Sequence, residues 1–223
     1  MTKNILLQAL IKFFSGLIMV GVLLFIPAGT FKYSNAWLFI GLLFIPMFIA
    51  GIILMFVNPD LLKRRLDAKE KEKEKKGVIL GSGVMFLLGF IIAGLNYRYS
   101  WTSISNNIVI ISSILFLISY IIYGEVLREN EYLYRTIKVD KNQKLVDTGL
   151  YGIVRHPMYF ATIILFLTIP LILNSIISFI IFLIYPVLII IRINNEEKVL
   201  LKELKGYKEY KKKVKYKLIP FIW

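Results

Sequence analysis

The sequence predicts an all-α, polytopic membrane protein with about five to six transmembrane helices, including a C-terminal helical hairpin, and with a polar loop and tail on the cytoplasmic side. Of its 223 residues 57% are hydrophobic, yet it carries 28 Lys and Arg against 14 Asp and Glu. The apolar residues form long runs and the charges fill the gaps, as in a chain embedded in lipid. Several runs reach the roughly 20 residues that a helix needs to cross hydrocarbon. At this length we expect a single integral membrane domain, residues 1–223.

Four apolar runs in the first 127 residues each predict one crossing helix. They cover residues 5–28, 36–57, 78–95 and 108–127. The first is longer than the apolar part of a signal peptide and lacks its cleavage site, so we expect it to remain as a helix. The third contains a Gly-Ser-Gly step at residues 81–83 without a preceding strand, which argues against a nucleotide loop and favours close helix packing.

The last apolar run, residues 158–191, predicts a tight helical hairpin. It is too long for one crossing, and Asn174 and Ser175 interrupt it with polar side chains that favour a turn. Each arm is short for a full crossing. With the four earlier runs, the hairpin gives six passes through the bilayer.

The basic residues predict the orientation of the chain. The gap at residues 58–77 contains eight Lys and Arg, whereas the connections on either side of it contain one each, Lys32 and Arg98. The connection 128–157 and the tail after residue 191 are also strongly basic. By the positive-inside rule these parts face the cytoplasm, and six passes then place both termini there.

Two polar segments connect the predicted helices on that side. Residues 67–76, DAKEKEKEKK, alternate in sign and predict a solvated helix or loop over the membrane surface. The connection 128–157 contains the turn-forming residues Asp140, Asn142, Asp147, Gly149 and Gly152. A following His-Pro step disfavours helix at His156, so we expect an ordered loop that enters the next helix with Pro157 in its first turn. Long ordered loops of this kind are usually functional.

The reactive side chains limit the chemistry. There is no Cys, which excludes disulfides, thiolate ligands and cysteine nucleophiles. There is one histidine, His156, so we expect no metal site. The basic residues concentrate at predicted membrane boundaries, and we expect membrane lipid rather than nucleic acid as their partner.

Three polar motifs at the predicted membrane boundary carry the candidate chemistry: GLYGIVRHPMY at 149–159, RINNEE at 192–197 and GYKEY at 206–210. Glu196 and Glu197 are acids that can hold cationic groups. Arg155, His156 and Arg192 are donors that can hold a carboxylate. Arg192 and Glu196 stand four residues apart on one helix face, so a charge pair is available to them. This set suits a methyl donor that combines a sulfonium, an ammonium, a carboxylate and an adenine.

The acceptor determines which further group is needed. A carboxylate acceptor requires no general base, and an arginine fork such as Arg192 can orient it. An amine or thiol acceptor must lose a proton, for which His156 is the candidate.

Each motif alone also has a simpler explanation. Arg155 and His156 can contact headgroups at a helix end, and adjacent acids such as Glu196 and Glu197 are typical of a solvated helix face. The boundary tyrosines are typical of an interfacial aromatic belt, namely Tyr151, Tyr159, Tyr207 and Tyr210. The occurrence of all three motifs, in this order and spacing, favours a function.

Taken together, the motifs resemble the isoprenylcysteine carboxyl methyltransferase family of integral membrane methyltransferases and its bacterial relatives. The resemblance covers about residues 145–223, and NPDLLKRRL at 58–66 is similar to a segment of bacterial members. It implies a prokaryotic plasma membrane and an S-adenosylmethionine pocket that opens toward a lipid-accessible tunnel. It also implies that residues 128–223 form the catalytic region and residues 1–127 serve substrate access.

Carried over by position, the resemblance assigns roles to individual residues. The implied cofactor-binding residues are Tyr151, Gly152, Arg155, His156, Tyr159, Glu196 and Glu197. The implied catalytic residues are Arg192, His156 and Glu196. The implied reaction is methyl transfer to a lipophilic small molecule or a prenylated substrate, with a carboxylate as the first candidate acceptor.

Other functions remain open. Sterol C14 reductases have a similar Arg-His-Pro-x-Tyr segment and use NADPH, although the paired acids and the small size of this chain favour a methyltransferase. Phospholipid N-methyltransferases share the paired acids, so a lipid amine is an alternative acceptor. A transporter or lipid-binding scaffold is disfavoured, because the charged residues stand at helix ends and not at the bilayer midplane.

Overall fold

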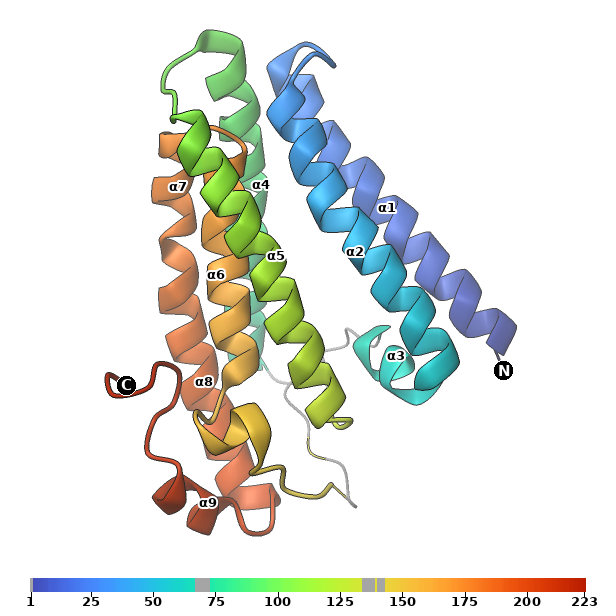
Figure 1. Ribbon diagram of the computed structural model, residues 1–223, viewed down its shortest axis with the longest axis vertical. Helices are drawn as coiled ribbons and strands as arrows, with labels where there is room; N and C mark the ends of the chain where they lie inside the picture. Colours follow the sequence, from blue (N-terminus) through green and yellow to red (C-terminus); the bar gives the residue numbers. More distant parts are fainter. Residues whose placement is uncertain (1, 67–72, 134–138, 140–142) are drawn as a thin grey trace.

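The computed structural model describes residues 2–66, 73–133, 139 and 143–223, and its regular structure in these ranges is helical (Figure 1). The helices are α1 (Thr2–Ala28), α2 (Ser34–Val57), α3 (Pro59–Leu66), α4 (Lys73–Tyr99), α5 (Asn106–Glu129), the 3-10 turn η1 (Gly149–Gly152), α6 (Pro157–Ile172), α7 (Ile176–Phe182), α8 (Ile184–Glu203) and α9 (Tyr207–Lys213). Residues 67–72 of the predicted solvated segment, and Asp140 and Asn142 of the predicted loop, lie outside the described residues.

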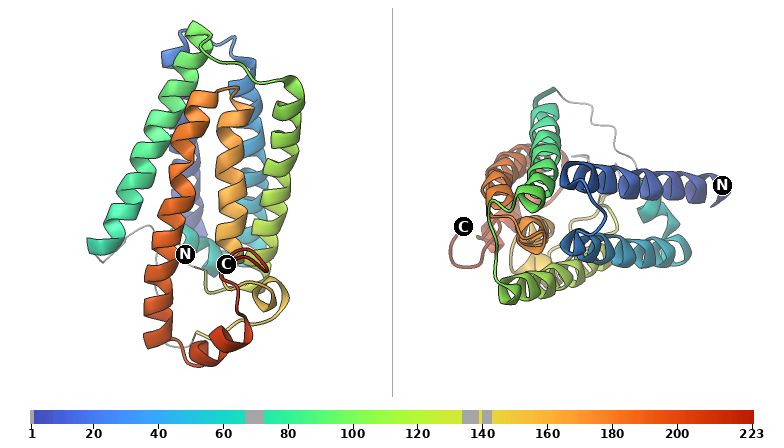
Figure 2. Two further views of the ribbon diagram at one scale, coloured as in Figure 1. Left: turned by 90° about the vertical axis from the view of Figure 1, so that its left-hand side faces the viewer. Right: turned by 90° about the horizontal axis from the view of Figure 1, so that it is seen from above.

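The long helices form one bundle whose members alternate in direction. The α1–α2, α4–α5 and α6–α7 connections lie at one end, and α3, η1 and α9 lie at the other (Figures 1 and 2). In the described ranges, five helical spans are long and apolar enough to cross a membrane, and α6, with 16 residues, is shorter. The expected all-α, polytopic architecture is confirmed.

The expectation of two short arms in the C-terminal hairpin is wrong for the second arm, because that arm remains helical beyond residue 191 and ends at Glu203. At 1.5 Å per residue, α6 is about 24 Å long and the continuous span 176–203 about 42 Å, against about 30 Å of hydrocarbon. The long arm is interrupted between α7 and α8, three residues before Pro186, which has no N–H to donate to the Phe182 carbonyl. The excess length carries the end of α8 beyond the other helices, toward α9 (Figure 1).

The hairpin turn lies where the sequence predicts it, at Asn174 and Ser175. Asn174 adopts a left-handed conformation with φ of 58°, which asparagine tolerates better than most residues. Ser175 caps α7 by accepting a hydrogen bond from the Ser178 backbone N–H at 3.2 Å. Asn96, from the end of α4, donates to the Asn174 carbonyl at 3.0 Å. These bonds hold the turn against the α4–α5 connection.

Side chains from the start of α2 complete the end of α6. The Tyr33 hydroxyl donates to the Leu173 carbonyl, and the Asn35 amide donates to the Ile172 carbonyl at 2.9 Å. The last carbonyls of a helix have no partner within it, and in an apolar environment an unpaired carbonyl costs several kcal/mol. The α1–α2 pair is therefore joined to the hairpin by polar contacts as well as by packing.

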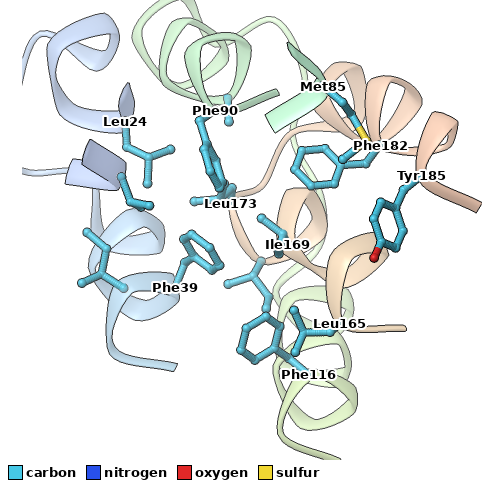
Figure 3. Close-up of a cluster of buried hydrophobic side chains, with 14 of the residues drawn as sticks. Leu24, Phe39, Met85, Phe90, Phe116, Leu165, Ile169, Leu173, Phe182 and Tyr185 are labelled. Carbon is cyan, nitrogen blue, oxygen red and sulfur yellow. The ribbon is translucent and has the colours of Figure 1, made fainter. Parts of the chain in front are cut away.

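A continuous apolar core fixes the relative positions of the helices. It combines side chains from six helices that are at most 5% exposed, namely Leu24, Phe39, Phe90, Phe116, Ile169 and Phe182 (Figure 3). A Cβ built on Gly89 would lie 2.3 Å from a Phe182 ring carbon, and one built on Gly94 would lie 2.6 Å from the Leu24 carbonyl oxygen. Two glycines of α4 thus permit the close helix packing expected of this segment.

Candidate functional site

A polar cleft lies at the end of the bundle occupied by η1 and α9. Its walls come from the start of α6, the second half of α8, α9 and the segment that follows α5, and the empty space between them is about 810 Å³, including the open mouth. α6 begins at this end with Pro157 in its first turn, directly after the non-helical residue His156, as the sequence predicts. The cleft is therefore built from the loop and helix ends that contain all three candidate motifs.

Glu196, Tyr159 and Arg192 form a connected polar chain along one wall. The Tyr159 hydroxyl donates to Glu196 Oε2 and accepts a hydrogen bond of 2.9 Å from Arg192 Nε. The Arg192 guanidinium carbon also lies 5.9 Å from the centre of the Tyr159 ring. The predicted relation between Arg192 and Glu196 on one helix face thus takes the form of a bridge through Tyr159, and all three residues line the cleft.

Glu197, next to Glu196 in sequence, belongs to a separate and buried network. Its Oε1 accepts a 2.7 Å hydrogen bond from Arg155 Nε, and the two side chains are only 6% and 4% exposed. Lys211 reaches Glu197 Oε2 at 3.2 Å. Because successive helix residues point about 100° apart, the two neighbouring acids face different surroundings.

The segment after α9 is bound to the His-Pro loop by backbone and side-chain contacts. Arg155 N–H donates to the Tyr216 carbonyl at 3.0 Å and His156 N–H to the Lys217 carbonyl at 2.9 Å. Arg155 Nη1 donates to the Val214 carbonyl at 2.6 Å. Arg155 therefore joins three parts of the chain that are distant in sequence: the loop, α8 and the C-terminal segment.

Two buried polar atoms at the cleft stand out among the described residues, because none of these residues provides them with a hydrogen-bond partner. They are His156 Nε2 and the hydroxyl oxygen of Tyr207. His156 Nε2 lies 3.5 Å from Glu197 Oε1, too long for a well-formed bond. Both residues line the cleft, and buried polar atoms without partners are rare in folded proteins. Such atoms fit a site that binds a polar ligand.

The remaining tyrosines of the motifs are structural contacts of the cleft wall. The Tyr210 hydroxyl donates to the Tyr151 carbonyl at 2.7 Å, and the Asn130 amide donates to the Tyr151 hydroxyl at 3.1 Å. Burial raises the pKa of Tyr151 and Tyr210 above that of a free phenol. Both hydroxyls therefore remain protonated at neutral pH.

The turn η1 is attached to the end of α5. Both carboxylate oxygens of Glu129 accept the Leu150 N–H at 3.0 Å. Gly149 has φ of 54°, and a Cβ built there would lie 1.6 Å from Glu129 Oε1. Glycine at this position is required both for the backbone conformation and for the approach of the carboxylate.

A second, mostly apolar groove adjoins the cleft. It lies between α2, α3 and α5, has about 1420 Å³ of empty space including its open side, and is lined along its length by residues such as Ala50, Ile53 and Leu127. Tyr132 and Lys144 line both the groove and the cleft, so the two spaces share a wall.

The structure brings six of the eight predicted site residues together at the cleft: Tyr151, Arg155, His156, Tyr159, Arg192 and Glu196. Gly152 and Glu197 are not among the lining residues. The sequence reasoning missed Asn130 and treated Tyr207 as a belt residue, although Tyr207 is 3% exposed and lines the cleft. The position of Tyr207 in the GYKEY motif was the one sequence feature that pointed to the site. A motif does not show whether a side chain is buried, so the burial of Tyr207 could not be predicted.

Comparison with known proteins bears on the same region. Residues 101–207 match the model of a family described as phospholipid methyltransferase. No curated protein matches the chain. The matched segment runs from the start of α5 to the start of α9 and contains every predicted site residue. Over residues 101–207, just under half of its length, the chain is therefore similar to the phospholipid methyltransferases, a family of the isoprenylcysteine carboxyl methyltransferase-like integral membrane methyltransferases.

Proposed function

We propose that this protein transfers a methyl group from S-adenosylmethionine to the polar end of a lipophilic acceptor at the membrane boundary. The observation that carries the proposal is the shared wall between the polar cleft and the apolar groove. A charged methyl donor requires a polar site and a lipid-soluble acceptor requires an apolar one, and the two sites must adjoin for the methyl group to pass between them. The family match supports methyl transfer as the reaction.

The cleft residues fit the methyl donor. When bound, S-adenosylmethionine supplies a methyl group activated by a sulfonium cation. Glu196, fixed by Tyr159, provides a carboxylate for the cationic groups, and His156 Nε2 provides a buried polar atom to which no described residue forms a hydrogen bond. Leu200 and Leu204 provide an apolar wall. The chain holds and orients the reactants, which is the main requirement of a displacement at carbon.

For the acceptor, a carboxylate is the first candidate. Its oxygen forms the new bond to the methyl carbon as the bond from carbon to sulfur breaks, so no proton has to be removed. Arg192 stands at the cleft with its guanidinium held by Tyr159, where it can orient a carboxylate. The adjoining groove, lined by residues of α2 and α5, can take the acceptor's apolar chain, and its open side would admit that chain from the lipid.

A lipid amine is the second candidate, favoured by the name of the matching family. An amine has to be unprotonated to attack, and the nitrogen loses a further proton when the product is neutral. His156 is the residue placed to accept a proton, because it lines the cleft and its Nε2, 3.5 Å from Glu197 Oε1, makes no hydrogen bond to a described residue.

A labelling experiment tests the proposal and separates the acceptors. Purified protein in detergent is incubated with methyl-labelled S-adenosylmethionine and a bacterial lipid extract, and the lipids are then treated with alkali. We expect label in the lipid fraction that depends on Glu196, because the Glu196→Gln variant loses the carboxylate that holds the donor. Label released by alkali as methanol identifies an ester, whereas label that resists alkali identifies an N-methyl product. No transfer to any lipid, with native protein that binds NADPH, would contradict the proposal.

A further inference from the structure

Tyr207 is the first residue of α9, and its phenol is placed differently from those of the other tyrosines at the cleft. The residue is 3% exposed and lines the cleft. Its hydroxyl oxygen is buried, and no described residue offers it a hydrogen bond. Burying a hydroxyl without a partner costs folding free energy. Phenylalanine would fill the same space without that cost, so the hydroxyl calls for an explanation.

The neighbouring Tyr210 shows what a purely structural tyrosine does in this setting. It is also 3% exposed, its ring lies 5.7 Å from that of Tyr207, and its hydroxyl donates to the Tyr151 carbonyl at 2.7 Å. The same short helix thus carries one buried phenol that is satisfied within the protein and one that is not. The unsatisfied one lines the space in which we place the methyl donor.

The surroundings of Tyr207 indicate which part of a ligand it meets. It packs in an apolar cluster with Leu204, Val214 and Leu145, and Leu145 and Leu204 also line the cleft. An apolar wall that carries a buried hydroxyl suits a purine or its ribose, whereas the cationic ammonium of the donor suits Glu196. Burial, followed by the charges of Glu197 and Glu196, raises the pKa of Tyr207, so its hydroxyl keeps its proton and can donate.

We infer that Tyr207 binds the adenosyl half of the methyl donor through its hydroxyl group, while Glu196 binds the amino acid half. The inference rests on the proposed function, because it requires that this cleft holds S-adenosylmethionine. It adds a binding residue outside the His-Pro loop and the paired acids. It also divides the cleft into an apolar adenosyl end at α9 and a charged end at α6 and α8.

The test measures ligand affinity and thermal stability and does not require an assay of methyl transfer. Tyr207→Phe and the matched control Tyr210→Phe are compared with the native protein by calorimetric titration with S-adenosylhomocysteine and by thermal unfolding in detergent. Competition with 5′-methylthioadenosine, which has the adenosyl half but no amino acid half, then locates the effect. Glu196→Gln serves as the reciprocal variant for the other half of the ligand.

We expect Tyr207→Phe to weaken the binding of both ligands by about 3- to 10-fold, the value of one hydrogen bond, with an unchanged or higher unfolding temperature. Tyr210→Phe should lower the unfolding temperature and leave affinity unchanged. Glu196→Gln should weaken S-adenosylhomocysteine far more than 5′-methylthioadenosine. This combination of lost affinity with retained stability distinguishes a ligand contact from a packing role.

Three results would overturn the inference. Equal affinity of Tyr207→Phe and native protein for S-adenosylhomocysteine would exclude the contact and leave the proposed function intact. Weaker S-adenosylhomocysteine binding with unchanged 5′-methylthioadenosine competition, or no competition by 5′-methylthioadenosine at all, would exclude the adenosyl assignment. A native protein that binds neither ligand would overturn the proposed function itself.

Discussion

Glu196 and Glu197 are adjacent on α8 but have separate roles: Glu196 accepts a hydrogen bond from Tyr159 at the cleft, whereas Glu197 is paired with Arg155 in the protein interior. Glu197 is 4% exposed as a residue and does not line the cleft. We therefore expect the two acids to make different contributions, Glu196 to ligand binding and Glu197 to the stability of the loop that forms the site.

Replacing Glu197 by Met is expected to destabilise the protein. The change leaves the Arg155 guanidinium buried without its carboxylate, and removing one partner of a buried pair costs about 3–5 kcal/mol. Urea unfolding in detergent, followed by intrinsic fluorescence, measures the loss. Glu203→Met, at an exposed position of the same helix, is the control and should change stability little. Equal stability of the two variants would show that the ion pair does not hold the loop.

The sequence predicted much of this region but not the division between the acids. Three polar motifs at a membrane boundary, with the paired acids among them, together indicated a site, and the polar residues Asn174 and Ser175 within an apolar run indicated the hairpin turn. Whether an acid faces the cleft or the interior depends on helix rotation and on where Arg155 comes to lie, which tertiary packing determines. The same limitation applies to Tyr207, since an aromatic residue at a membrane boundary has the same sequence pattern whether it is buried or exposed.

Gly149→Ala is expected to detach η1 from α5. The new Cβ would overlap the Glu129 carboxylate and would impose a left-handed conformation on alanine, at a cost of about 1–3 kcal/mol. Limited proteolysis between α5 and α6 measures the effect as faster cleavage. Gly152→Ala is the matched control, since its Cβ would lie 3.4 Å from the Asp147 carbonyl oxygen, a tolerable contact. Equally fast cleavage of both variants would contradict the role of Gly149.

Filling the apolar groove is expected to weaken the binding of the lipid acceptor and to leave the binding of the methyl donor unchanged. Gly124 lines the groove, and no described atom lies within 4 Å of a Cβ built there, so Gly124→Phe places a ring in the space. The KM for a lipid acceptor should rise about 10-fold or more, with unchanged S-adenosylhomocysteine affinity. Gly51→Phe, on α2 and outside the groove lining, is the control. An unaltered KM in Gly124→Phe would exclude the groove as the acceptor's site.

The proposed orientation is directly measurable, because the chain has no cysteine. A single Cys is introduced in place of Lys212 on α9 or of Ser103 in the α4–α5 connection, both exposed positions at opposite ends of the bundle. The basic residues near α3 and α9 predict that this end of the bundle lies in the cytoplasm. In intact cells, a membrane-impermeant maleimide should label the Ser103→Cys variant, and the Lys212→Cys variant only after permeabilisation. The reverse pattern would invert the orientation.

The measurement that tests the central claim most directly is calorimetric binding of S-adenosylhomocysteine to the detergent-purified protein, with Glu196→Gln and the exposed control Glu209→Gln alongside. The proposed site predicts saturable binding by the native protein and by Glu209→Gln, and a loss of at least about 10-fold in affinity in Glu196→Gln, since a charge-assisted hydrogen bond contributes about 1.5–3 kcal/mol. Absence of binding by the native protein, or binding of NADPH in its place, would contradict the assignment of this cleft to methyl transfer.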